Sequence, residues 1–257
     1  MRTTVHEGTE PGTGPLTTGL GRARRTRRLA AALAGLVALV AALAVGVMVT
    51  KLGAARTGEL GLDVSISHHR DAALTDLALA VNLLLGTLVA PVLLVVVCAT
   101  IWVRSRFVAT TVAMLTAVGW FSVEVGKLLV QRTRPPATAV HALVSETAAD
   151  SYPSGHTAFA AGALFAVVAA LALAGRSTRA AWMIGVPVVA VVALSRLYLG
   201  VHYLSDVIAS VVFAGASILV AVAVVQPWLM RLQHADLHRR AASVAAPARE
   251  EDSEGEA

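Results

Sequence analysis

The stretch SRLYLGVHYLSD, residues 195–206, lies between two apolar segments and carries an arginine, a histidine and an aspartate. On a helical path His202 and Asp206 are four residues apart, so their side chains would share one face. A carboxylate beside an imidazole can fix the tautomer of the ring and raise its basicity. Arg196 adjoins the preceding apolar run, where a bare charge is unfavourable and therefore a functional candidate. The stretch indicates one part of a site that other segments complete.

The composition is that of a helical membrane protein. Of the 257 residues, 56% are hydrophobic and only 14% are charged. The apolar runs are continuous rather than alternating, which argues against a β-barrel. The formal net charge of +5 comes from short clusters beside apolar runs, a pattern of membrane topology, and we expect no nucleic-acid partner. The single cysteine, Cys98, excludes an intrachain disulfide.

The hydropathy pattern predicts an all-α, polytopic membrane protein with a six-transmembrane-helix bundle. The first apolar run is long enough to span the bilayer and longer than a signal-peptide core, so we expect it to be retained. After it, residues 51–73 read as a solvated polar loop, in which His68 and His69 lack metal-ligand partners. Residues 74–85 read as an interfacial or partly buried helix. The predicted spans are residues 29–50, 86–103, 107–130, 156–174, 180–194 and 207–225.

The chain divides into a disordered basic N-terminus (1–28), a membrane domain (29–230) and a disordered tail (231–257). Arginine clusters flank the same ends of an even number of spans, and by the positive-inside bias that side is cytoplasmic. Both termini are then cytoplasmic, in a multi-pass protein of the plasma membrane. The loop 131–152 and the turn 196–206 fall on the extracytoplasmic face. The clusters are residues 22–28, Arg104 and Arg106, Arg176 and Arg179, and Arg231, Arg239 and Arg240.

A second candidate segment is KLLVQRTRP, residues 127–135. Lys127 and Arg134 are seven residues apart, about two helical turns, so both could project from one face at the end of the third span. Pro135 then stops the helix. The alternative is interfacial anchoring, because lysine and arginine often snorkel at span ends. Glu124, one turn before Lys127, is interpreted as its buried structural partner, the alternative being that it helps to set the charge of the site.

The third segment is PSGH, residues 153–156. Ser154 is a natural N-cap, and Gly155 lets a ligand approach the backbone at a helix N-terminus, where free N–H groups favour a phosphate. His156 would sit just inside, at the aqueous edge. In isolation the segment is equally consistent with an ordinary cap and a surface histidine. The corresponding alternative for residues 195–206 is a structural Arg196–Asp206 ion pair.

Together the three segments can perform phosphoryl transfer. Fixed cations and backbone amides match the oxygens of a phosphoryl group and could do the electrostatic work that magnesium does elsewhere. Neutral His202 can attack phosphorus, with Asp206 holding the useful tautomer. His156 can protonate the leaving oxygen and then take a proton from water. We therefore expect no metal and no cofactor, and no carboxylate cluster suited to a metal is visible.

These segments resemble the motifs of the type 2 phosphatidic acid phosphatase family, which shares a superfamily with the vanadium-dependent haloperoxidases. KxxxxxxRP, PSGH and SRxxxxxHxxxD occur in order, over about residues 60–226, with Ser210 where many relatives have glycine. The resemblance implies a metal-independent membrane phosphatase acting on lipid phosphates or pyrophosphates. It assigns phosphate binding to Lys127, Arg134, Ser154, Gly155 and Arg196, and the roles of nucleophile, partner and general acid to His202, Asp206 and His156.

The expected substrate is a membrane lipid phosphate: undecaprenyl pyrophosphate first, then phosphatidic acid and phosphatidylglycerol phosphate. The main alternative is a non-catalytic lipid-binding or flipping protein that keeps the pocket. Retention of both His156 and His202 weighs against it. A vanadate-dependent haloperoxidase is a further alternative, against which the six spans favour lipid access.

Overall fold

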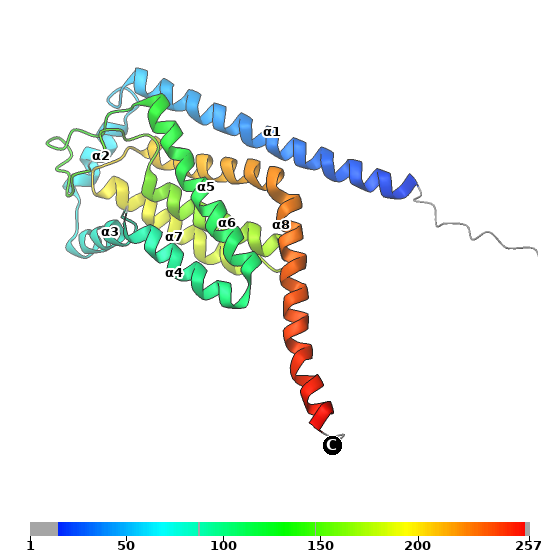
Figure 1. The fold of residues 1–257 in the computed structure, drawn as a ribbon. Coiled ribbons are helices and arrows are strands. Elements are labelled where there is room, and N and C mark those ends of the chain that lie inside the picture. Colours follow the sequence, from blue (N-terminus) through cyan, green and yellow to red (C-terminus); the bar gives the residue numbers. More distant parts are fainter. Residues whose placement is uncertain (1–14, 87, 147, 255–257) are drawn as a thin grey trace, which may run out of the picture.

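The computed structural model describes the backbone of residues 15–254 except residues 87 and 147, and within that range the side chains of residues 21–241. The regular secondary structure of the described residues is α-helical, which confirms the all-α prediction, and the long helices run side by side (Figure 1). The helices are α1 (Pro15–Leu52), α2 (Glu59–His68), α3 (Ala72–Leu84), α4 (Val89–Arg104), α5 (Arg106–Val130), α6 (Gly155–Leu173), α7 (Arg179–Tyr198) and α8 (Leu204–Glu254).

Five of these helices are long and apolar enough to cross a membrane: parts of α1 and α8, and all of α5, α6 and α7. Helices α3 and α4 pass the same test together, as a pair bent by 68°. The pair is either a sixth, broken span or a re-entrant segment, whereas the sequence predicted an interfacial helix followed by a separate short span. The helical membrane fold is otherwise the one expected.

The centre of the bundle is formed by α5, α6 and α8, which contact one another, while α7 packs on α6 and α1 packs on α8. Small residues allow this close approach, as is common between membrane helices. A Cβ atom at Gly119 of α5 would lie 3.1 Å from the Cα of Gly162 in α6. The three central helices therefore hold each other's ends in register, and two of them begin with candidate site residues.

Helix α8 bends, and its C-terminal part projects away from the bundle (Figure 1). Pro227 has no N–H to donate to the carbonyl of Ala223, four residues earlier. Arg28 of α1 supplies the missing donor: its Nε donates to that carbonyl at 2.8 Å, and its Nη2 donates to the carbonyl of Val224 at 3.3 Å. The basic end of α1 is thus fixed to the turn of α8 that precedes Pro227.

Three segments expected to lack regular structure are at least partly helical. The solvated loop predicted for residues 51–73 contains α2. Glu59 and Asp63, one helical turn apart, form the buried face of this helix, so the segment packs on the rest of the protein instead of lying in solvent. Helix α1 already begins at Pro15, and α8 continues to Glu254. Residues 1–14 and 255–257, also predicted to be disordered, lie outside the described residues.

Candidate active site

The three candidate segments meet at one end of the bundle, where α5 and α7 end and α6 and α8 begin; we call this the site end. Gly126 allows the PSGH segment to pack on α5. Pro153 lies so close that a Cβ atom at Gly126 would be 2.6 Å from Cδ of the proline. Beside them, the backbone N–H of Ser154 donates to the carbonyl of Asp206 at 3.3 Å. The PSGH segment is thus anchored to both α5 and α8.

Lys127 lies in the last turn of α5 and donates to Glu124 at 3.0 Å. The predicted pairing is confirmed, but Glu124 is not buried, since 56% of its side chain is exposed. Helix α5 ends at Val130, and Gln131 adopts a left-handed conformation with φ of 50°. Arg134 therefore lies in the following loop, and the prediction that it shares a helical face with Lys127 is wrong.

The PSGH segment starts α6, and Ser154 is its N-cap residue as predicted. The side chain of Ser154 does not cap a backbone N–H; it accepts instead from the hydroxyl of Thr157 at 3.2 Å. A Cβ atom at Gly155 would lie 3.9 Å from Nζ of Lys127, so the cation stands beside the helix start. Within the described chain, Nε2 of His156 is buried without a hydrogen-bond partner.

Arg196 lies in the last turn of α7 and is completely buried. Its Nη1 donates to Oδ1 of Asn82 at 2.8 Å and lies 3.5 Å from Oε1 of Glu146. The alternative of an Arg196–Asp206 ion pair is therefore wrong. In the part of the chain that the structure describes, its Nη2 has no partner. This free donor and Nε2 of His156 are groups that a bound phosphate would satisfy.

His202 lies in the loop between α7 and α8, whereas Asp206 lies in α8. The prediction that the two side chains share one helical face is therefore wrong. The two residues are nevertheless neighbours, with Nδ1 of His202 3.5 Å from Oδ2 of Asp206. The shorter contact of Nδ1, at 2.8 Å, is to the carbonyl of Ser151. Because a carbonyl only accepts, the proton resides on Nδ1, and Nε2 keeps its lone pair.

Nε2 of His202 faces Nη1 of Arg134 at 3.2 Å, and that arginine also donates to the carbonyls of Val201 and Ala148. Burial lowers the pKa of His202, and the charges of Arg134 and Arg196 lower it further, against the opposing effect of Asp206. The imidazole is therefore neutral at neutral pH, with its lone pair aimed at a cation.

Sequence reasoning missed Glu146, whose carboxylate lies among the cations of the site. Burial alone would raise the pKa of Glu146, but the surrounding basic groups, Arg134 foremost and Arg196 among them, outweigh it and lower the pKa. The carboxylate is thus ionised where an anionic ligand would be expected. Nothing in its surrounding sequence distinguishes Glu146 from Asp150, the other acid of the polar loop.

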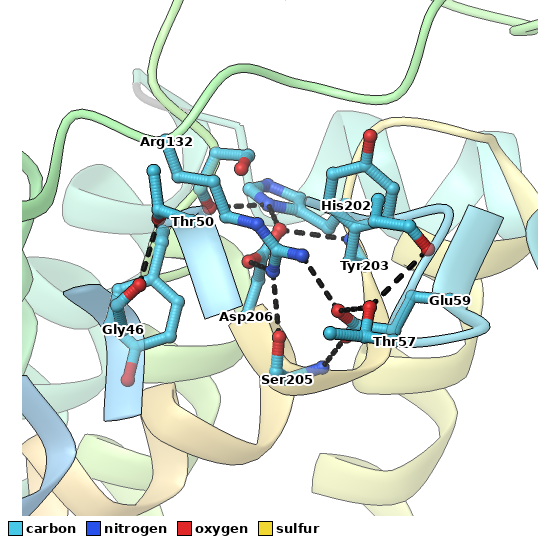
Figure 2. Close-up of polar contacts among 12 residues, drawn as sticks. Gly46, Thr50, Thr57, Glu59, Arg132, His202, Tyr203, Ser205 and Asp206 are labelled. Atoms are coloured by element: carbon cyan, nitrogen blue, oxygen red, sulfur yellow. Dashed lines mark hydrogen bonds and ion pairs between the residues drawn. The ribbon is translucent and has the colours of Figure 1, made fainter. Parts of the chain in front are cut away.

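Sequence reasoning also missed Arg132, two residues before Arg134. Figure 2 shows its guanidinium between Asp206, Ser205 and Glu59. Its position inside the KLLVQRTRP segment gave no reason to separate it from ordinary flanking arginines. No group of three His, Cys, Asp or Glu side chains suited to a metal ion occurs among the described residues.

Comparison with known proteins shows the family and the fold of the chain. The family model of the PAP2 superfamily matches residues 81–230, and the chain belongs to this superfamily. A similar solved structure is that of the first transmembrane PAP2-type phosphatidylglycerolphosphate phosphatase from Bacillus subtilis. The TM-score is 0.60 at 18% sequence identity, over 73% of this chain and 92% of that one, which shows a shared fold. No curated protein matches the sequence. The predicted resemblance and the membrane fold are confirmed.

Proposed function

We propose that the protein is an integral-membrane phosphatase that hydrolyses a lipid phosphate or pyrophosphate without a metal. The observation that carries this proposal is the convergence of Arg134, Arg196 and Lys127 around two histidines, with Nη2 of Arg196 and Nε2 of His156 lacking partners in the described structure. A phosphoryl group offers acceptors to these donors and a phosphorus atom to His202. Membership of the PAP2 superfamily supports the same reaction class.

The reaction proceeds in two displacements. Nε2 of His202 attacks phosphorus and forms a P–N bond, while the P–O bond to the lipid breaks and His156 donates a proton to the leaving oxygen. His156 then removes a proton from water, whose oxygen attacks phosphorus as the P–N bond breaks. Phosphate leaves, and both histidines return to their starting states. Arg134, Arg196 and Lys127 stabilise the charge on the phosphoryl oxygens throughout.

The substrate is proposed to enter sideways from the bilayer. An apolar cavity of about 500 Å³ between α6 and α7 is lined by Phe159 and Ala160, about one turn from His156 along α6. Such a cavity suits an acyl or prenyl chain whose phosphate lies at the site end. We place the site end on the extracytoplasmic face of the plasma membrane and both termini in the cytoplasm, because the arginine clusters flank the opposite ends of the spans.

The test is a phosphate-release assay on detergent-solubilised protein in the presence of EDTA. The panel contains undecaprenyl pyrophosphate, phosphatidic acid and phosphatidylglycerol phosphate, the last also because the solved neighbour is named for it. Release from at least one lipid, abolished by His202→Ala, is expected. A folded wild-type protein that releases phosphate from none of them contradicts the proposal. A His202→Ala variant whose function is unchanged would favour the non-catalytic alternative, a lipid-binding or flipping protein.

A further inference from the structure

Arg132 is among the most buried charged residues at the site end, with 3% of its side chain exposed. It lies outside the fixed positions of the three motifs. Its contacts reach α2, which precedes the residues matched by the family model. A buried guanidinium is unfavourable unless it is fully paired, so its partners indicate what it does.

Both terminal nitrogens of the Arg132 guanidinium are hydrogen-bonded, and one face of its plane is covered by an aromatic ring. Nη1 donates to Oδ1 of Asp206 at 2.7 Å and to Oγ of Ser205 at 2.6 Å, whereas Nη2 donates to Oε2 of Glu59 at 2.6 Å. The other oxygen of Glu59 accepts from the backbone N–H of Ser205 at 2.7 Å. The ring of Tyr203 covers the guanidinium, with its centroid 4.1 Å from Cζ (Figure 2).

Arg132 controls both groups that face Nδ1 of His202. Its side chain binds Oδ1 of Asp206, while Oδ2 accepts from the backbone N–H of Tyr203 at 2.8 Å. Its backbone carbonyl accepts from the N–H of Ser151 at 2.7 Å, and the carbonyl of Ser151 in turn accepts from His202. One residue thus fixes the acceptor that sets the tautomer and the carboxylate that sets the local charge.

We propose that Arg132 and Glu59 are positioning residues of the reaction, which make α2 part of the catalytic centre. Glu59 holds the guanidinium, and the guanidinium holds Asp206 and offsets its charge beside the nucleophile. The inference rests on the proposed function for its kinetic readout. It goes beyond that function because neither residue would touch the phosphate.

The charge balance gives this role a signature that a purely structural ion pair would not have. The Asp206 carboxylate favours the charged form of His202, whereas the cation of Arg132 offsets that carboxylate. Other groups also act on this unit: Glu59, Asp63, Tyr203 and Tyr152 around Asp206 and Arg132, and Arg134, Arg196, His156 and Glu146 around His202. All of them are unchanged in Arg132→Gln, so they do not cancel the effect of removing its cation. Without Arg132, Asp206 would stabilise the imidazolium, and the nucleophile would be protonated at a higher pH.

The experiment compares Arg132→Gln and Glu59→Gln with wild type and with the control Arg70→Gln. Arg70 is a matched control because it also joins separate segments, donating to the carbonyls of Tyr198 and Val140, but it does not contact Asp206. For Arg132→Gln we expect kcat to fall about 30- to 100-fold with KM changed less than about twofold. For Glu59→Gln we expect kcat to fall about 5- to 10-fold. The kcat of the double variant should be no lower than that of Arg132→Gln, because both residues act through the same contact.

The second readout is the protonation of His202, followed by NMR of 15N-histidine-labelled protein in detergent. In Arg132→Gln both the ring titration and the acid limb of kcat/KM should move to higher pH, by about 0.5 to 1 pH unit. Arg70→Gln should leave both unchanged. Because the ring titration needs no turnover, it separates this inference from the proposed function.

Wild-type kcat and an unshifted His202 titration in both Arg132→Gln and Glu59→Gln would overturn the inference, even with an active enzyme. A wild-type protein without phosphatase activity would instead overturn the proposed function, and the titration would still decide the positioning role. If Arg132→Gln does not fold, Arg132→Lys keeps the charge but cannot bridge Asp206 and Glu59 together. It should then show the same loss of kcat.

Discussion

Two buried aspartates of α8 bind similar groups, but the arginines that bind them differ in exposure. Asp206, at the site end, accepts from Arg132 and from a backbone N–H, and Asp236 accepts from Ser105, the N–H of Arg106 and two arginines. The difference lies in the arginines: 3% of the Arg132 side chain is exposed, against 41% and 49% for Arg239 and Arg240.

The comparison teaches that the same ion pair has a different function according to its access to water. Although Asp236 is buried, water can reach both of its arginines when the ion pair is lost, so the cluster mainly fastens α8 to the turn between α4 and α5. At Asp206 no water can do so, and the pair sets the position and charge of the groups around His202.

The largest effect should come from Asp206→Asn, compared with Asp236→Asn. The first change leaves Arg132 buried opposite a neutral amide, and we expect a loss of about 3–5 kcal/mol in the free energy of unfolding. The second should change it by less than about 1 kcal/mol, because the partners stay hydrated. Thermal unfolding in detergent measures both. Equal losses in the two variants would break the comparison.

A somewhat smaller effect is expected from Gly126→Ala, which tests the packing that anchors the site end. The new methyl group would lie 2.6 Å from Pro153 and displace the PSGH segment. We expect a loss of about 1–3 kcal/mol of stability together with reduced phosphate release. The matched control is Gly61→Ala in α2, where nothing lies within 4 Å. That change should be neutral or stabilising by about 0.5–1 kcal/mol, and an inactive Gly61→Ala would contradict this account.

Asp63 adds a pH dependence to the buried cluster. Burial raises its pKa to about 7, assisted by the charges of Asp206 and Glu59. The unfolded chain titrates at about 3.9, so the folded state binds the proton more tightly and stability falls as pH rises from about 4 to 7. Asp63→Asn should therefore be more stable than wild type at pH 8, by roughly 2–6 °C in Tm. The difference in Tm between Asp63→Asn and wild type should shrink towards pH 4. A difference that grows towards pH 4 would refute the raised pKa of Asp63.

The smallest effect concerns Glu146, a carboxylate of the site end that is partly exposed. Its charge opposes a phosphate near Arg196, 3.5 Å away. Glu146→Gln should tighten the binding of inorganic phosphate about 3- to 10-fold, measured by calorimetry. The control is Asp76→Asn, which removes the same charge from an exposed residue and should leave phosphate binding unchanged. Weaker phosphate binding in Glu146→Gln would show that the carboxylate supports the site rather than competing with the ligand.

Much of the fold could be predicted because membrane spans are encoded in local composition. The apolar runs predicted the long helices, and the arginine clusters predicted that the three motifs share one end. The bend between α3 and α4 was missed because residues 74–85 carry Asp76 and Asn82 among apolar residues. The polar side chain of Asn82 is explained by a tertiary contact, since it accepts a hydrogen bond from Arg196.

The convergence of the three segments could be predicted from residue types, while the roles of their residues stay predictions. His156, His202 and the cations could be recognised, whereas the contact that fixes the tautomer of His202 is made by a backbone carbonyl, that of Ser151. Any residue could supply that carbonyl. Likewise, Arg134 leaves the helix because of the conformation of Gln131, and Glu59 joins the site from another helix. Such contacts depend on tertiary structure and leave no motif.

The central claim is that His202 carries the phosphoryl group during turnover. The most direct test is rapid alkaline quenching of the enzyme mixed with a 32P-labelled lipid phosphate, followed by peptide mapping. The account predicts an acid-labile, base-stable label on the peptide that contains His202, absent from His202→Ala. A turning-over enzyme whose label lies on another residue, or that hydrolyses the lipid without ever carrying label, would contradict it.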